Sequence, residues 1–256
     1  MLGWQIFVHS VRMVFRNLQA ALQIGLVPNV AAAVLSFAIL YFTGSNVELV
    51  DGSELATSPV QVFLSIVVAL MNLVVTVWIF VAWHRFILLE EYPKGWIPPF
   101  RTDRLFDYIG YTFLLIAICV LAAIIFAIPV IIVAVLISLS PVFSWLPAIL
   151  PLFVVIVLYA VFLRLGAVLP AAAIGKTIGF KAVKEATAGH NAVFFAIAVI
   201  MFVVQIAVLL FLVQAIQFLP VVGIASQTII GLIGSLINVS VLTTMYGVFI
   251  EKRELA

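Results

Sequence analysis

A long uncharged stretch of the sequence covers residues 108–163 and reads YIGYTFLLIAICVLAAIIFAIPVIIVAVLISLSPVFSWLPAILPLFVVIVLYAVFL. It begins directly after Asp107 and ends directly before Arg164. A helix needs about 20 apolar residues to cross the hydrocarbon core of a bilayer, so this stretch is too long for one span and fits two. Residues 138–141, Ser-Leu-Ser-Pro, interrupt it with residue types that favour turns. The stretch therefore predicts two membrane helices joined by a turn.

The rest of the chain divides in the same way. The uncharged interval between His190 and Glu251 breaks at residues 218–220, and two further apolar runs lie nearer the N-terminus. The predicted spans are residues 20–43, 59–85, 108–138, 147–169, 191–218 and 222–249. None of these runs alternates between polar and apolar residues as membrane β-strands do. We therefore predict an all-α membrane protein, a six-helix transmembrane bundle forming a single domain over residues 1–256.

The composition excludes several other classes of protein. Hydrophobic residues make up 66% of the chain and charged residues 9%, and the mean hydropathy is +1.37. Soluble domains are about 45–50% apolar and about 25% charged, so a soluble globule of this composition could not cover its surface. The chain is also too apolar for intrinsic disorder. A net charge of +2 predicts no nucleic-acid partner, and the single cysteine, Cys119, allows no intrachain disulfide.

The basic residues all fall on one side of the predicted membrane. They lie before the first span, between the second and third, between the fourth and fifth, and after the sixth: Arg12, Arg16, Arg85, Lys94, Arg101, Arg104, Arg164, Lys176, Lys181, Lys184, Lys252 and Arg253. The other side carries Glu48, Asp51 and Glu54 in its first loop. Loops rich in Lys and Arg remain in the cytoplasm. The distribution therefore predicts that both termini are cytoplasmic.

Residues 1–19 have the pattern of an amphipathic helix. Apolar side chains recur at helical spacing at Trp4, Phe7, Val8, Val11, Val14, Phe15 and Leu18, while the other face carries Gln5, His9, Arg12, Arg16 and Gln19. Such a helix lies in the membrane interface, with its basic face toward anionic headgroups. The alternative is that this segment extends the first span into solvent.

The cytoplasmic segments also show signs of structure. Residues 90–100 hold three prolines and three aromatic residues, which favour a fold back onto the membrane surface. Residues 178–187 predict a second amphipathic helix, ended by Gly189. An aromatic–basic pair precedes each pair of spans, at residues 15–16, 100–101 and 180–181. These pairs favour three helical-hairpin repeats, although three hairpins with basic ends would produce part of this pattern by topology alone.

Three segments carry a resemblance to a known family. They are residues 83–90 (WHRFILLE), 164–171 (RLGAVLPA) and 181–189 (KAVKEATAG). Together they resemble uncharacterised six-span bacterial inner-membrane proteins akin to the membrane domain of glycerophosphodiester phosphodiesterases. The resemblance covers nearly the whole chain through short motifs, and it implies a bacterial inner-membrane location. Because the chain holds no soluble phosphodiesterase domain, that activity is not expected of it.

Two arginines near the ends of spans are the main candidates for a binding site. Arg85 and Arg164 are each followed by several uncharged residues, so both are predicted to lie slightly inside the membrane boundary. They could extend to lipid phosphates and pair with Glu90, Asp107 or Glu185, or they could together grip one anionic headgroup between hairpins. The candidate residues for headgroup or interface contact are Arg85, Arg164, His84, Glu90, Arg12, Arg16, Lys181 and Lys184.

Small and polar residues within the spans predict helix packing. Gly231 and Ser235 have a small-xxx-small spacing, which favours close packing inside the protein or with another copy. Uncharged polar residues predict hydrogen bonds between helices, or else a polar pore lining: Asn29, Asn72, Thr76, Gln205, Gln214, Ser235, Asn238 and Thr243.

The sequence contains no motif for catalysis. We find no phosphate-binding loop, zinc-protease, serine-hydrolase or dinucleotide motif, so we expect no cofactor and no enzymatic activity. The first hypothesis is therefore a scaffold, accessory subunit or assembly factor of a membrane complex. The second is a transporter or binder of lipid or another hydrophobic anionic solute. Expected partners are membrane lipids, including anionic phospholipid, and another membrane protein or complex.

Overall fold

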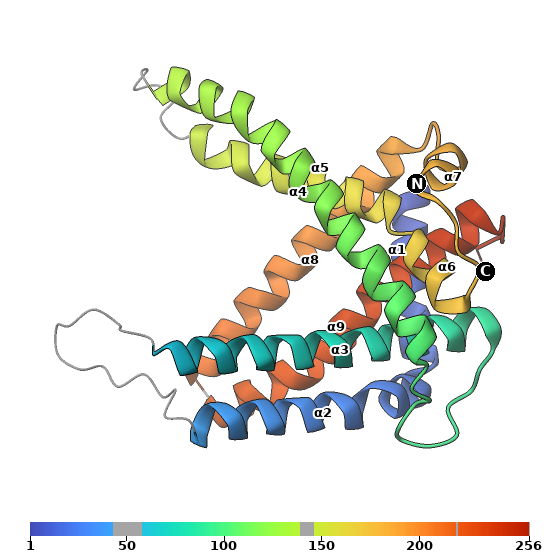
Figure 1. Ribbon diagram of the computed structural model, residues 1–256. Coiled ribbons are helices and arrows are strands. Elements are labelled where there is room, and N and C mark those ends of the chain that lie inside the picture. The colour runs from blue at the N-terminus through green and yellow to red at the C-terminus, as the bar shows by residue number, and fades with distance from the viewer. Residues whose placement is uncertain (43–57, 139–145, 219, 256) are drawn as a thin grey trace, which may run out of the picture.

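The computed structural model describes residues 1–42, 58–138, 146–218 and 220–255, which form helices and no strand. Within these residues six helices are long and apolar enough to cross a membrane, which confirms the predicted all-α, multi-pass architecture (Figure 1). The elements are α1 (Leu2–Arg16), α2 (Leu18–Phe42), α3 (Pro59–Leu89), α4 (Thr102–Ser138), α5 (Leu146–Leu165), α6 (Val168–Ile174), α7 (Phe180–Ala186), α8 (Asn191–Phe218), α9 (Pro220–Met245) and a π-helix (Tyr246–Ile250).

The six spans pair into three helical hairpins, α2–α3, α4–α5 and α8–α9. Figure 1 shows these hairpins leaving a common base, which also holds α1, α6, α7 and both termini. The hairpins α2–α3 and α4–α5 diverge toward their far ends. We call the end with the termini the basic end, because the basic residues of the chain lie there or in the segments that meet there. The predicted acidic residues of the opposite side, Glu48, Asp51 and Glu54, lie outside the described residues.

Buried side chains are concentrated near the basic end. We call this half of the molecule the hub, and the far halves of the spans the arms: residues 33–42, 59–76, 116–138, 146–162, 202–218 and 220–231. Of the arm residues with a described burial, Gly223 alone is buried. In a bilayer, acyl chains are as apolar as leucine, so exposed apolar side chains carry no large cost. The packing that determines this fold therefore resides in the hub.

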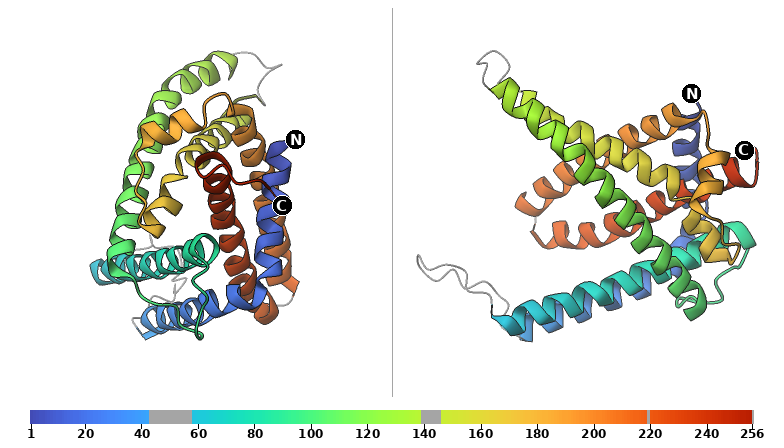
Figure 2. Two further views of the ribbon diagram at one scale, coloured as in Figure 1. Left: turned by 90° about the vertical axis from the view of Figure 1, so that its right-hand side faces the viewer. Right: turned by 45° about the horizontal axis from the view of Figure 1, so that its top comes forward.

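Helix α1 has the orientation of an interfacial helix. It runs across the direction of the spans (Figure 2) and packs against α8 and α9. The chain turns at Asn17 between α1 and α2, so the alternative of one continuous first span is wrong. The face of α1 that packs inward consists of Gly3, Ile6, Ser10 and Val14. Other members of the predicted apolar stripe, including Trp4 and Phe15, face outward.

The fourth span differs from its prediction as one helix over residues 147–169. Helix α5 ends at Leu165, and the short helix α6 follows after a turn. Gly166 allows this turn to lie against α9, because a Cβ atom there would lie 2.8 Å from Leu242 Cδ2. Helix α6 is buried from Val168 to Ala173 and packs against α3, α4 and α9. Its apolar sequence resembles the continuation of a span, so only its tertiary contacts reveal it as a separate element.

The three hairpins of the predicted repeat are present, but the segments that precede them differ. Helices α1 and α7 precede the first and third hairpins, as predicted. Residues 90–101, before the second, are irregular and fold back along α3. There Trp78 Nε1 donates to the Pro99 carbonyl at 3.2 Å, and the Trp78 ring meets Phe100 edge-on. A common evolutionary repeat therefore stays a prediction.

Candidate functional site

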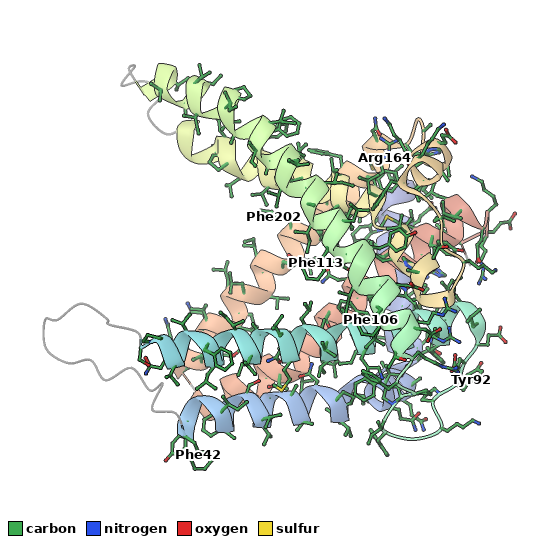
Figure 3. All side chains as sticks on the ribbon, viewed as in Figure 1. Phe42, Tyr92, Phe106, Phe113, Arg164 and Phe202 are labelled. Atoms are coloured by element: carbon green, nitrogen blue, oxygen red, sulfur yellow. The ribbon has the colours of Figure 1, made fainter. Side chains whose placement is uncertain are left out.

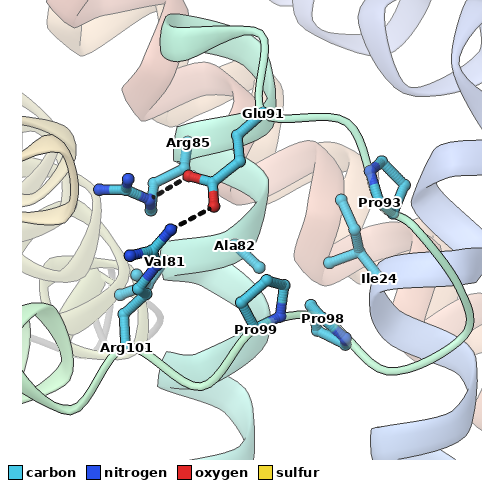
Figure 4. A pocket seen from close by; sticks show the side chains of 9 residues that line it. All are labelled: Ile24, Val81, Ala82, Arg85, Glu91, Pro93, Pro98, Pro99 and Arg101. Atoms are coloured by element: carbon cyan, nitrogen blue, oxygen red, sulfur yellow. Dashed lines mark hydrogen bonds and ion pairs between the residues drawn. The ribbon is translucent and has the colours of Figure 1, made fainter.

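The end of α3 builds a cluster of one carboxylate and two guanidinium groups. Glu90 ends the helix in the left-handed conformation, with φ of 53°. This turn brings Glu91 back toward Arg85, whose Nε donates to Glu91 Oε2 at 2.7 Å, while Arg101 Nη2 donates to Glu91 Oε1 at 2.9 Å (Figure 4). The predicted pairing of Arg85 with Glu90, Asp107 or Glu185 is therefore wrong. The partner is Glu91, because the turn at Glu90 directs the following side chain to the helix.

This Arg85–Glu91–Arg101 cluster borders a pocket of about 20 Å³, which is enough for about one water molecule. Burial alone would raise the pKa of Glu91, but hydrogen bonds from Arg101 and Arg85 outweigh it and hold that pKa below its ordinary value. The hydrogen bond to Glu91 also raises the pKa of Arg101. Glu91 is therefore held in its ionised form, and one carboxylate with two guanidinium groups gives the cluster a formal net charge of +1.

Arg164 anchors a different part of the hub. Its Nε donates to Thr187 Oγ1 at 2.9 Å, its Nη1 to Asn191 Oδ1 at 2.8 Å, and its Nη2 to the Lys184 carbonyl at 3.0 Å. One side chain thus joins α5 to α7 and to the start of α8. Figure 3 shows Arg164 beside α7, well apart from Tyr92, the residue that follows Glu91.

The two arginines that the sequence singled out contact different residues. Besides Glu91, Arg85 donates through Nη1 to the Ala173 carbonyl at 3.2 Å, at the end of α6. All three guanidinium nitrogens of Arg164 are occupied by protein acceptors. The shared grip on one headgroup that the sequence suggested is therefore not seen. Both side chains instead fasten short elements to the spans.

His84 was predicted at the headgroup interface, but the structure buries it completely. Its Nδ1 lies 2.8 Å from Thr243 Oγ1, and its Nε2 lies 3.4 Å from the Tyr108 hydroxyl. Successive residues on a helix point about 100° apart. His84 therefore faces into the hub while Arg85 faces its rim, and the prediction for His84 is wrong.

Hydroxyl groups on α9 form the polar part of the hub. Trp83 Nε1 donates to Ser240 Oγ at 2.8 Å, and Thr244 Oγ1 lies 2.9 Å from Ser10 Oγ of α1. With Thr243, these residues hold α3 and α1 on one face of α9. Sequence reasoning missed Trp83, Ser10, Ser240 and Thr244. The spacing of the hydroxyls at residues 240, 243 and 244 is the i, i+3, i+4 pattern of one helix face and could have revealed them.

The other predicted interface residues remain accessible. The exposed residues among them are Arg12, Arg16, Glu90, Lys181 and Lys184. Their contact with lipid headgroups stays a prediction.

The predicted packing of α9 through Gly231 and Ser235 is not seen among the residues that the structure describes. A Cβ atom placed on Gly231 has nothing within 4 Å, and Ser235 Oγ donates to the Leu232 carbonyl of its own helix. Helix α9 packs instead through Leu232 and Leu236, which are buried. Packing of Gly231 and Ser235 against another copy stays a prediction.

Polar side chains within the spans do connect helices, as predicted. Asn72 Nδ2 of α3 donates to Ser36 Oγ of α2 at 2.9 Å. The Tyr159 hydroxyl of α5 donates to Asn238 Oδ1 of α9 at 2.9 Å. These bonds confirm the interhelical role predicted for Asn72 and Asn238.

Comparisons of the chain with protein-family models, curated proteins and solved structures found no match. The resemblance to the six-span inner-membrane family therefore stays a prediction. In the part of the chain that the structure describes, no group of three His, Cys, Asp or Glu side chains could hold a metal ion.

Proposed function

We propose that this protein is a non-catalytic scaffold of a bacterial inner membrane, acting as an accessory subunit or assembly factor, with both termini in the cytoplasm. The observation that carries the proposal is the division into a packed hub and open arms. In α4, for example, Leu115 is the last buried residue, and no described side chain beyond it is buried. The basic residues are grouped at the end that holds both termini, which supports the proposal that the termini are cytoplasmic.

The hairpin α4–α5 shows what the arms offer to a partner. Half-buried alanines, including Ala123, Ala127 and Ala134, recur along one face of α4, as expected where two helices pack closely. Large apolar residues cover another face, and Leu121, Ile125 and Ile128 are 61–68% exposed. Because the hub holds the hairpin at its base, this face is presented to the bilayer at a fixed place. It is suited to packing against the helices of another membrane protein.

Photo-crosslinking within native membranes tests the proposal. A photoreactive amino acid placed singly at Leu121, Ile125 or Ile128, which share one face of α4, is expected to give protein adducts of the same mass. Phe106 is the matched control, because it is 75% exposed on the same helix but lies at the basic end. It is expected not to give that adduct. Adducts with phospholipid alone at all four positions would contradict the scaffold.

A lipid-binding or lipid-transporting protein is the second candidate. It is favoured by Arg101, whose side chain is 49% exposed even though it pairs with Glu91. Exposed aromatic side chains lie close in the chain, at Trp96 and Phe100. Such a combination of guanidinium and aromatic groups suits an anionic headgroup at the membrane surface. Exclusive recovery of phospholipid in the crosslinking experiment would favour this function.

A further inference from the structure

A carboxamide lies halfway along the membrane-spanning helix α8. The helix has 28 residues, Asn191–Phe218, and Gln205 is at its midpoint, about 20 Å from either end. Gln205 is exposed, and Val204 and Ile206 on either side of it are exposed as well. A polar residue that also contacts neighbouring helices is therefore left exposed at the depth where acyl chains surround the protein.

The hydrogen bonds of Gln205 are incomplete. Its Nε2 lies 3.3 Å from Asn238 Oδ1 and 3.5 Å from the Tyr159 hydroxyl, and Asn238 Oδ1 already accepts the shorter bond from Tyr159 at 2.9 Å. A glutamine side chain offers two donors and a carbonyl acceptor. Within the described residues the structure gives no donor to the Gln205 carbonyl. An unpaired carbonyl in a medium that cannot form hydrogen bonds is unfavourable.

We propose that Gln205 is the anchor for a transmembrane helix of another membrane protein, which carries a polar side chain at its centre. Phospholipid headgroups cannot supply the missing donor, because they lie about 15 Å from the midplane. A segment that crosses lipid beside α8 must satisfy its own backbone, so it is a helix. Asn, Gln, Ser and Thr side chains form such bonds between helices. This inference rests on the proposed scaffold function and specifies the chemistry of its partner.

Peptide binding to the purified full-length protein in liposomes tests the inference. The probe is a synthetic polyleucine helix of about 20 residues with Lys at both ends and one central Asn, and an all-Leu peptide is the reference. Energy transfer between labelled protein and labelled peptide reports binding. We expect the Asn peptide to bind about threefold to thirtyfold more tightly than the all-Leu peptide. The variant Gln205→Leu is expected to abolish this difference.

Two further variants distinguish a specific effect of Gln205 from a general disturbance of the protein. Gln214 is exposed on the same helix and turned about 180° around its axis, so Gln214→Leu is expected to keep the preference for the Asn peptide. Tyr159→Phe removes the internal bond to Asn238 but leaves the Gln205 amide in place, and it is also expected to keep the preference. Loss of preference in either variant equal to that in Gln205→Leu would overturn the inference.

Other outcomes also decide against the inference. Equal binding of both peptides to the wild-type protein would overturn it. Energy transfer between two differently labelled copies of the protein, lost in Gln205→Leu, would assign the site to a second copy. The photo-crosslinks at Leu121, Ile125 and Ile128 do not depend on Gln205. Protein adducts at these three positions, without tighter binding of the Asn peptide, would support the scaffold function but contradict the role of Gln205 as an anchor.

Discussion

Replacing Trp83 by Ala is expected to lower the free energy of unfolding by about 3–5 kcal/mol. Trp83 is fully buried in the hub, within a cluster that joins α1, α2, α3 and α9. Its ring lies 5.4 Å from that of Phe86, and its Nε1 donates to Ser240. Truncation would leave a cavity and take the donor from the Ser240 hydroxyl. The free energy of unfolding falls because the side chains that line the cavity lose their van der Waals contacts, and lipid does not enter the cavity to replace them.

Pulse proteolysis in mixed micelles of mild detergent and SDS would measure this change. Trp96→Ala is the matched control, because Trp96 is 52% exposed in the irregular segment before α4. Its truncation is expected to change the free energy of unfolding by less than about 0.5 kcal/mol. Equal effects of Trp83→Ala and Trp96→Ala would contradict the packing of the hub described above.

Replacing Arg164 by Leu is expected to have the second large effect, lowering the free energy of unfolding by about 2–4 kcal/mol. Three hydrogen bonds from one guanidinium group hold α7 and the start of α8 against α5. The substitution also removes the donor to Thr187, whose side chain is buried. Because α7 has only seven residues, it depends on these contacts rather than on its own helical stability. We therefore expect α7 to open locally before the hub unfolds.

Hydrogen–deuterium exchange of residues 180–191 in nanodiscs would detect this opening. Faster exchange is expected in Arg164→Leu. Lys184→Ala is the matched control, since it removes a nearby positive charge but keeps the backbone carbonyl that Arg164 contacts. Exchange that stays at the wild-type rate in Arg164→Leu, or that rises equally in Lys184→Ala, would show that the guanidinium does not hold α7.

The spans could be predicted because their signal is local. The limits of α8 were predicted at residues 191 and 218, and the start of α3 at Pro59, as the structure has them. The sequence predicts the end of α3 at Arg85, four residues before its end at Leu89, because charged residues are rare inside membrane spans. Pairing with Glu91 allows Arg85 to remain within the helix.

The candidate site was less predictable because it depends on contacts between distant segments. Arg85 and Arg164 were identified as the informative charges, but their partners were not. Glu91 becomes a partner only through the left-handed turn at Glu90. His84 is buried because it faces Thr243 on α9. The residues beside His84 in the sequence do not reveal this contact.

The most direct test of the account measures the separation of the arms. Pulsed electron paramagnetic resonance in nanodiscs would compare two spin-label pairs on α3 and α4, in a Cys119→Ala background. One pair, at Val62 and Val133, lies on the arms; the other, at Leu89 and Phe106, lies at the basic end, and all four positions are exposed. A packed hub with diverging arms predicts a clearly longer distance for the arm pair. An arm distance equal to or shorter than that at the basic end would show a closed bundle and contradict the account.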